Sequence, residues 1–551
     1  MSGRKFKSGE TPDFVIVGSG AAGGVIAREL SRTGFSVLVL EQGPRLEAGD
    51  FEHDELKYFF LNGITNDPKS SPQTFRTRPS ETAQQPFGSF LPATYARIVG
   101  GSSTHFTANF WRFHEVDFNE RSVLGHIPGT GFADWPITYQ DLEPYYTKVE
   151  WEVGVSGLAH ASPFDPPRSK PYPMPPLPVK SSGVLMERGA RKLGLHPFPA
   201  PMAIASQSYR GRGPCVHCGF CMGFGCEARA KSSTLYTMIP EAEATGRCEI
   251  RPLSYVFRVE VNPQGRATGV YYFDAAKREH FQAAHAVVLS ANGAETARLL
   301  LNSTSNRFAH GLANSSGLVG KHLMFNQGSS VQGVFEHPLN EFKSVQVTRI
   351  LHDFYDSDPK RGFYGGGGID ARINPQPALW ALASGGDLPS WGAEFKKRLE
   401  VFPRTMAVTG HTTSLPLEAN SVSIDPTLKD GWGIPAMRVT YKDHPDDMAT
   451  AKFFQDRSYE ILAAAGAQKI WRDALEESTA GVHLLGTARM GNDAATSVVD
   501  KYHRTHDVAN LFLCDGSSFV TSGRGQPTMT IQALAFRAAD YIGQFAKRNE
   551  I

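Results

Sequence analysis

The sequence predicts an α/β fold in which a Rossmann-type domain receives an inserted α+β domain that carries an antiparallel sheet. Three observations predict this fold. A strand–helix–strand unit with a glycine-rich turn opens the chain, glycine- and hydroxyl-rich segments return near its end, and 551 residues exceed one compact domain. We expect the first domain over residues 1–50, 85–115, 210–320 and 475–551, and the inserted domain over residues 116–209 and 321–474.

The opening unit begins with a short β-branched run over residues 13–17, which is typical of a buried strand. A glycine turn over residues 18–23, a helix over residues 24–30 and a second strand over residues 36–40 follow directly, and the second strand leads into Glu41. This order of elements is that of a dinucleotide-binding βαβ unit.

Each glycine of that turn has a physical task in such a unit. Gly18 permits the tight turn, Gly20 lets the backbone approach a pyrophosphate, and Gly23 allows the helix to pack closely on the strand. The phosphates then meet the helix N-terminus, where free amides and the helix dipole favour negative charge. Glu41 can accept hydrogen bonds from ribose hydroxyls. The turn therefore predicts a dinucleotide site.

The rest of the chain is less regular. Three segments have the composition of strands: residues 269–273, 285–290 and 510–515. Residues 528–545 have helical apolar spacing, whereas residues 164–178 hold too many prolines for a helix or a central strand and predict an extended connector. Four consecutive glycines, 365–368, indicate a mobile loop.

The composition argues against three classes of protein. With 56 basic and 55 acidic residues and no long run of either sign, the chain has no electrostatic footprint for nucleic acid. No apolar run is long enough to span a membrane, and the basic N-terminus lacks the apolar stretch of a secretory signal, so the sequence by itself predicts a cytoplasmic protein. The cysteines are clustered rather than scattered in pairs, which argues against a disulfide scaffold.

The cysteine cluster is the strongest sign of a metal centre. Its spacing, C-x2-C-x2-C-x4-C, is formed by Cys215, Cys218, Cys221 and Cys226. Zinc knuckles usually come as two separated pairs, whereas the x2–x2 run is that of ferredoxin-type ligands, so an iron–sulfur centre is favoured over structural zinc or an accidental cluster. Cys248 and Cys514 are expected to be buried, inert thiols.

Further motifs in fixed order resemble the glucose-methanol-choline (GMC) oxidoreductase family over nearly the whole chain. The motifs are the loop 97–109, the segments 292–301 and 483–491, the pair Asp515-Gly516, and the segment 526–534. The family binds FAD and oxidises alcohols, so the resemblance implies a GMC/pyranose-oxidase-like FAD-binding domain. Besides the glycine turn and Glu41, the implied cofactor contacts are Gly100, Gly101, Ser102, His105, Asn109, Val256, Asp515, Gly516, Pro527 and Thr528.

For His105 and Pro527 the resemblance implies specific contacts with the flavin. In pyranose-oxidising relatives a Ser-Thr-His-aromatic-Thr segment holds the flavin covalently through its histidine, and residues 103–107 resemble it. The alternative is that His105 packs on the dimethylbenzene edge of FAD. Pro527 suits the first turn of the last helix, whose positive end could face the flavin pyrimidine ring.

His483 is the expected catalytic base, because its H-x-x-G-T-x-x-M-G context matches the family and a neutral imidazole can remove a hydroxyl proton. The partner position, usually asparagine or histidine in the family, falls on Gln526, which can still hydrogen-bond a substrate oxygen. The other scattered histidines are expected to be structural or to lie on the substrate side: His114, His322, His411 and His444. Glu418 and Asn420 are candidates for sugar contacts.

Within the family, the cysteine segment resembles the large subunits of bacterial iron–sulfur sugar dehydrogenases, in particular glucoside 3-dehydrogenases. The resemblance implies oxidation of a sugar or glycoside hydroxyl, most often at carbon 3, and a 3Fe-4S or 4Fe-4S cluster held by three or four of the cysteines. It also implies a small partner subunit that carries the export signal, a cytochrome c or quinone-linked acceptor, and a periplasmic location by co-export.

Three alternatives remain at the level of the sequence. The first is an oxygen-using sugar or alcohol oxidase of the same fold, in which the cysteines bind zinc or nothing. The second is a sorbitol-, fructose- or gluconate-type dehydrogenase. The third is a non-catalytic electron-transfer flavoprotein, which only Gln526 at the partner position favours.

Overall fold

A computed structural model describes residues 4–7, 9–86, 90–340, 343–372, 376–383 and 389–551. Its first layer is a five-stranded parallel sheet in the order β17-β9-β1-β2-β5. The strands are β1 (Phe14–Val17), β2 (Val37–Leu40), β5 (Cys248–Arg251), β9 (Ala286–Leu289) and β17 (Leu511–Leu513). β1, β2 and β9 are buried at every position, as expected for a parallel sheet covered on both faces.

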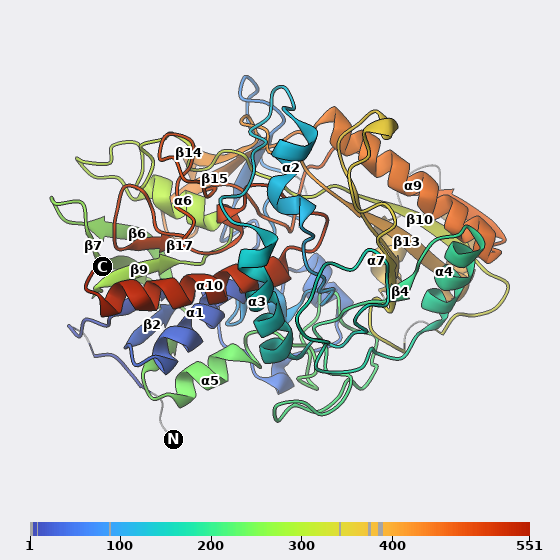
Figure 1. Ribbon diagram of the computed structural model, residues 1–551, viewed down its shortest axis with the longest axis horizontal. Helices are drawn as coiled ribbons and strands as arrows, with labels where there is room; N and C mark the ends of the chain where they lie inside the picture. Colours follow the sequence, from blue (N-terminus) through green and yellow to red (C-terminus); the bar gives the residue numbers. More distant parts are fainter. Residues whose placement is uncertain (1–3, 8, 87–89, 341–342, 373–375, 384–388) are drawn as a thin grey trace.

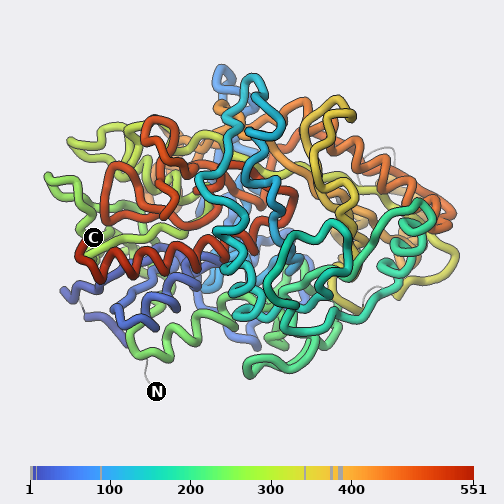
Figure 2. Tube along the Cα trace, viewed as in Figure 1, coloured from blue at the N-terminus to red at the C-terminus, as the bar shows by residue number. Residues whose placement is uncertain are grey.

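The parallel sheet lies between helices and a small antiparallel sheet. Helix α1 (Ala21–Arg32) packs against α5 (Met238–Ala244) and α10 (Thr528–Lys547), so both ends of the chain meet in one layer. Figure 2 shows the blue N-terminal and red C-terminal segments side by side. The small sheet is a meander of β6 (Tyr255–Val261), β7 (Ala267–Phe273) and β8 (Glu279–Ala283), and β7 contacts β9.

A second, six-stranded sheet has antiparallel neighbours in the order β16-β10-β13-β12-β11-β4. Its strands are β4 (Phe198–Pro199), β10 (Gly328–Val334), β11 (Arg349–Leu351), β12 (Gly367–Arg372), β13 (Thr405–Thr412) and β16 (Lys469–Arg472). Helices α4 (Ser181–Lys192) and α9 (Pro445–Ala465) pack on each other and on this sheet (Figure 1). The predicted α/β fold with an inserted antiparallel sheet is thereby confirmed.

The remaining elements connect and cover these layers. The helices are α2 (Val116–Leu124), α3 (Tyr139–Val149), α6 (Glu295–Asn302), α7 (Pro377–Ala383) and α8 (Gly392–Glu400). A further three-stranded sheet joins β3 (Gln73–Arg76), β14 (Ser421–Lys429) and β15 (Pro435–Thr440). The short 3-10 or π turns are η1 (Ala48–Asp50), η2 (Leu56–Phe60), η3 (Gly101–Thr104), η4 (Glu150–Gly154), η5 (Pro359–Arg361), η6 (Phe402–Arg404) and η7 (Gly516–Ser518).

Local sequence patterns predicted β1, α1, β2 and four further elements. The three apolar segments are β7, β9 and β17, and the last helix is α10, while residues 164–178 contain no helix or strand. The domain bounds stay a prediction, and β3 lies in a segment assigned to neither domain. No helix in the described part of the chain combines the length and apolarity that crossing a bilayer requires.

The prediction of a mobile loop at residues 365–368 is wrong. All four glycines are buried, and Gly367 and Gly368 begin β12. A Cβ atom on Gly366 would lie 1.9 Å from the Tyr355 carbonyl oxygen, and one on Gly367 equally close to that of His411. The glycines are therefore needed for close approach of backbones rather than for mobility.

Candidate active site

A cavity of about 550 Å³ is lined from both large sheets. On one side lie the carboxyl ends of β1 and β2, through Gly18 and Glu41, which is where ligands bind in open α/β sheets. On the other side lie Arg372 of β12 and His411 of β13. The volume falls within the range of small-molecule and cofactor sites.

The glycine turn forms a narrow cradle at one end of this cavity. Gly18 has a φ of +94°, and a Cβ atom on Gly23 would lie 1.9 Å from the Gly18 carbonyl oxygen, so Gly23 packs under the turn rather than lining the cavity. A Cβ atom on Gly101 would lie 2.7 Å from the Cα atom of Gly20, where the two loops meet. Gly20 caps α1 without a side-chain bond, which leaves the first amides of the helix for an anion.

Glu41 and Ser19 link the glycine turn to the loop that contains Gly100. Its buried carboxylate accepts hydrogen bonds from the Ser19 amide (3.0 Å), the Ser19 hydroxyl (2.7 Å) and the Gly43 amide (2.9 Å). The Ser19 hydroxyl in turn accepts a bond from the Gly100 amide at 3.0 Å. Burial raises the pKa of Glu41, and these bonds oppose the rise. Glu41 thus both lines the cavity and fixes the turn.

Most of the other predicted cofactor contacts lie around the same cavity. They are Gly101, Ser102, His105, Val256, Asp515, Gly516, Pro527 and Thr528, whereas Gly100 is not part of the lining. Asp515 accepts bonds from the Ser517 amide and the Thr296 hydroxyl, and burial raises its pKa. Asn109 is not part of the lining, and its amide group donates to Asp370 at 2.9 Å. The first turn of α10 points its positive end at the cavity through Pro527 and Thr528.

These features fit FAD. The cradle has no room for side chains where a pyrophosphate would lie, and the helix amides suit its charge. The Nε2 atom of His105 is buried and has no hydrogen-bond partner among the described residues, as expected of a side chain that meets a ligand. Burial, with a smaller effect of Lys231, lowers the pKa of His105 to about 4. Covalent attachment through His105 and simple packing against the flavin both stay predictions.

His483 and Gln526, the predicted base and its partner, line the same cavity. His483 is partly exposed to the cavity but lies deep in the protein. Removal from bulk water, followed by the nearby His411 and Arg372, lowers its pKa to about 3. The imidazole is therefore neutral near pH 7 and has a lone pair available to accept a proton.

A polar cluster of Asp370, Arg372 and His411 lies near His483, and Arg372 and His411 line the cavity. Arg372 donates to Asp370 through Nε (2.7 Å) and Nη2 (3.0 Å), and His411 Nε2 lies 2.8 Å from Asp370. Burial would raise the pKa of Asp370, but Arg372 and His411 outweigh it and hold that pKa well below its usual range. The buried carboxylate thus fixes a guanidinium and an imidazole at the cavity wall.

Strand alternation explains this cluster. Ile369 and Ala371 of β12, with Met406 and Val408 of β13, pack into one apolar cluster with Phe454 of α9. Residues at the intervening positions, including Asp370 and Arg372, therefore point to the opposite face, toward the cavity. His411 was expected to be structural or on the substrate side, whereas Asp370 and Arg372 were not predicted as site residues. The alternating Ile-Asp-Ala-Arg segment was the available signal.

The cysteine loop, residues 215–226, adjoins the cavity. Met222 and Gly223 line it, and the Gly223 amide donates to the His105 carbonyl at 2.8 Å. All six cysteines of the chain, each within the described residues, are free thiols, and Cys221 is the buried member of the loop. Burial raises the pKa of Cys215 to about 12 and of Cys221 to about 11, so a bound cation would be needed to keep them as thiolates.

Lys231 supplies positive charge beneath the loop. Its buried ammonium donates to the carbonyl oxygens of Phe106 (3.1 Å), Cys221 (2.6 Å) and Phe224 (2.7 Å). Its amide lies 3.5 Å from the Cys226 sulfur. A cation and an amide donor beside the sulfurs fit a thiolate-held, anionic centre.

The other candidates lie elsewhere. Glu418 pairs with Lys321 at the surface, and Asn420 is buried. Neither lines the cavity, nor do His114, His322 and His444. Cys248 and Cys514 are buried and free.

Comparison with known proteins agrees with this geometry. Family models described as GMC oxidoreductase match residues 13–326 and 416–535. The chain is 34% identical to 2-methyl-1,2-propanediol dehydrogenase of Mycolicibacterium austroafricanum, over 98% of this chain and 96% of the relative. It is 31% identical to the fructose dehydrogenase large subunit of Gluconobacter japonicus, over 96% and 97%.

Solved structures agree at the level of the fold. Formate oxidase of Aspergillus oryzae superimposes with a TM-score of 0.66 at 15% identity, over 99% of this chain and 100% of that one. The glycine cradle and the cavity therefore agree with both family models. The chain belongs to the GMC oxidoreductase family of FAD-dependent sugar and alcohol dehydrogenases and oxidases.

Proposed function

We propose that this protein is a dehydrogenase that oxidises a secondary hydroxyl of a sugar or glycoside, at carbon 3, to a ketone, and passes the electrons through an iron–sulfur cluster to an external acceptor. The observation that carries the proposal is the shared loop. Met222 and Gly223 line the cavity that holds His483, and the same loop carries the four clustered cysteines.

The chain's own residues perform the proton chemistry. Neutral His483 accepts the hydroxyl proton of the substrate, and the Gln526 amide holds the substrate oxygen in place. A positioned base of this kind contributes roughly 10²–10⁴-fold to the rate. Bound FAD would supply the acceptor for the hydride that leaves the carbon bearing the hydroxyl.

The polar cluster of Asp370, Arg372 and His411 supports a polyhydroxylated substrate. Sugar hydroxyls both donate and accept hydrogen bonds, and a fixed guanidinium and imidazole at the wall offer matching partners. A small vicinal diol is the second candidate, because a relative 34% identical to this chain is a 2-methyl-1,2-propanediol dehydrogenase.

We propose that electrons leave the active site through a cluster bound by the cysteine loop. The Lys231 ammonium and the Cys226 contact suit an anionic cluster of the 3Fe-4S or 4Fe-4S type, with zinc as the alternative occupant. The fructose dehydrogenase relative is a large subunit. By analogy we propose a small partner subunit, a cytochrome c or quinone-linked acceptor, and a periplasmic location reached by co-export.

Electron paramagnetic resonance of protein purified without air tests the proposal. Spectra are recorded before and after methyl glucoside is added, for the wild type and for Cys221→Ser, with Cys248→Ser as a control thiol outside the loop. We expect an iron signal that changes on adding substrate in the wild type and the control, and is lost in Cys221→Ser. Flavin bleaching without any iron signal would instead indicate an oxidase, with hydrogen peroxide as product.

A further inference from the structure

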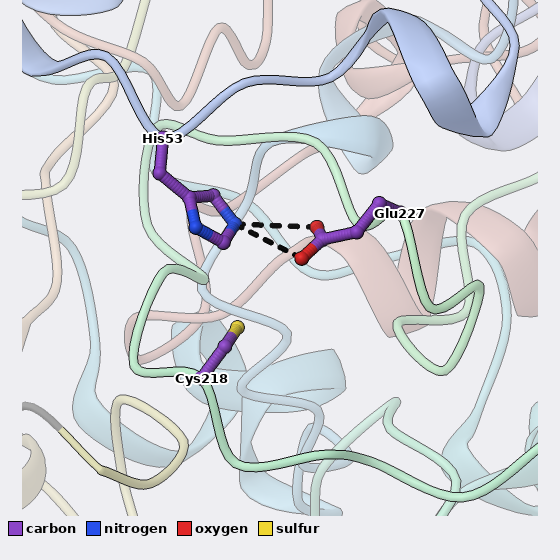
Figure 3. A group of neighbouring side chains, drawn as sticks. All are labelled: His53, Cys218 and Glu227. Atoms are coloured by element: carbon purple, nitrogen blue, oxygen red, sulfur yellow. Dashed lines mark hydrogen bonds and ion pairs between the residues drawn. The ribbon is translucent and has the colours of Figure 1, made fainter.

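Three metal-binding side chains converge beside the cysteine loop (Figure 3). A ring nitrogen of His53, the Cys218 sulfur and a carboxylate oxygen of Glu227 all lie within 4.8 Å of one another, the one such group in the described part of the chain. His53 Nε2 is 3.2 Å from the Glu227 carboxylate. His53 precedes η2 and Glu227 follows the cysteine loop, so two segments distant in sequence meet here.

Packing fixes the position of His53. Its ring stacks on Phe220, with centroids 4.1 Å apart and planes 7° apart, and the edge of Phe224 lies beside it. Phe51, two residues before His53, lies where a Cβ atom on Gly225 would meet its ring at 1.9 Å. The segment that carries His53 is thus closely packed on the cysteine loop, and this packing keeps the three side chains together.

The chemistry of the group is that of a zinc site. Imidazole, thiolate and carboxylate are the three protein ligands of Zn²⁺, and its bonds of about 2.0–2.3 Å place tetrahedral ligand atoms roughly 3.3–3.8 Å apart. The spacing here needs little adjustment to reach that geometry. The side chains of His53 and Glu227 are 31% and 39% exposed, so water has access to the fourth position.

Charge also favours a cation between these groups. A cation bound between these side chains would be attracted by the Glu227 carboxylate and would favour the thiolate form of Cys218. By contrast, Lys231 contacts the backbone at Cys221 and the sulfur of Cys226 and supplies positive charge there. The four clustered cysteines are therefore not equivalent.

We propose that His53, Cys218 and Glu227 bind one Zn²⁺ ion at the surface, apart from the centre at the other three cysteines. Cys215, Cys221 and Cys226 then remain for the iron–sulfur cluster, and this last assignment rests on the proposed function. It corresponds to a three-iron cluster with three cysteine ligands.

Equilibrium dialysis of the full-length protein against radioactive zinc tests the site. We expect one tightly bound zinc per chain in the wild type, and affinity at least about tenfold weaker in His53→Ala and Glu227→Gln, since each loses a ligand. His196→Ala is the matched control, because it removes a histidine–carboxylate pair (2.7 Å to Asp353) that has no cysteine beside it. Zinc binding unchanged in both His53→Ala and Glu227→Gln overturns the proposal.

Cys218→Ser separates the zinc site from the cluster. We expect this variant to lose zinc and to keep the iron resonance signal. Loss of the iron signal, with zinc affinity unchanged, assigns Cys218 to the cluster and overturns the proposal. If the wild type has no iron signal, the proposed function fails, while the zinc titrations of His53→Ala and Glu227→Gln still decide the present inference.

Discussion

The groups around His483 disfavour protonation of its imidazole, so the side chain can act as a base. His411 and Arg372 lie near it, and its pKa is lowered to about 3. The imidazole therefore starts each turnover unprotonated and ready to accept a proton. It gains that proton only when the substrate hydroxyl supplies it.

Replacing His483 by asparagine is expected to lower the rate of anaerobic flavin reduction by roughly 10²–10⁴-fold, because the hydroxyl proton loses its acceptor. The measurement is stopped-flow absorbance of the flavin after mixing with methyl glucoside. His337→Asn, at an exposed histidine, is the control and should reduce at the wild-type rate. A flavin reduction rate in His483→Asn within about twofold of the wild-type rate would show that His483 is not the catalytic base.

The lowered pKa of His483 also predicts the pH dependence. The base acts when unprotonated, and a pKa of about 3 keeps it so well below the usual histidine value near 6.5. We therefore expect kcat/KM to stay nearly constant as pH falls from about 8 to about 5, measured with an artificial dye at constant ionic strength. A decline centred near pH 6.5, with FAD fully retained, would contradict this expectation.

Arg372→Gln is expected to raise KM for the glycoside about tenfold or more, with a smaller change in kcat. Hydrogen bonds to a charged group are worth about 1.5–3 kcal/mol, and Arg372 is argued to hold hydroxyls that do not react. Steady-state kinetics with the dye separate the two constants. Arg278→Gln, in an exposed pair with Asp274, is the control. A fall in kcat alone would place Arg372 in the chemical step instead.

At the scale of the element, β12 is the strand on which the site depends most. Its glycines lie against neighbouring backbone, and its polar residues reach the cavity, so any displacement of the strand moves Asp370 and Arg372. The buried strand thereby serves both the core and the chemistry.

Gly367→Ala is expected to destabilise the protein by on the order of 1–3 kcal/mol, because the new methyl group would overlap the His411 carbonyl oxygen. Chemical denaturation with tryptophan fluorescence measures the change. Gly213→Ala is the control with the same substitution, because a Cβ atom at that position has nothing within 4 Å and the residue has no left-handed φ. Equal stability of the two variants would mean that β12 tolerates the added atom.

Local patterns predicted the parts of the fold that are local. The turn of Gly18, Gly20 and Gly23 could be found from sequence, since strand, turn and helix are consecutive residues. For the polar cluster, the alternating segment 369–372 was a local signal, but the pairing of β12 with β13 across an intervening segment, which brings His411 beside Asp370, was not predictable from any short pattern. The same limit explains the wrong loop at residues 365–368, since glycines serve close backbone approach as well as mobility.

At the scale of the whole molecule, a buried ion network joins the inserted segment to the C-terminal one. Arg524, two residues before Gln526, contacts Asp117 and Glu120 at the start of α2 and the Tyr355 carbonyl oxygen. All three charged side chains are fully buried. The network thus holds the segment that bears Gln526 at the cavity.

Arg524→Met is expected to cost about 3–5 kcal/mol of stability, because two buried carboxylates lose their partner. Thermal and denaturant unfolding of the FAD-loaded protein measure it. Arg278→Met, at an exposed arginine, should leave the unfolding transition unchanged. If Arg524→Met unfolds like the wild type, protonation of Asp117 or Glu120, whose pKa values burial already raises, has compensated for the lost charge.

The buried ammonium of Lys231 has an energetic consequence for the direction of electron flow. A fixed positive charge stabilises every electron that arrives near it, and it does so more strongly inside the protein than in water. Any redox centre held by Cys221 and Cys226 therefore has a higher reduction potential with Lys231 in place than without it. Lys231 would therefore favour the transfer of an electron from the active site onto such a centre, and would make the onward transfer to an external acceptor less favourable by the same free energy.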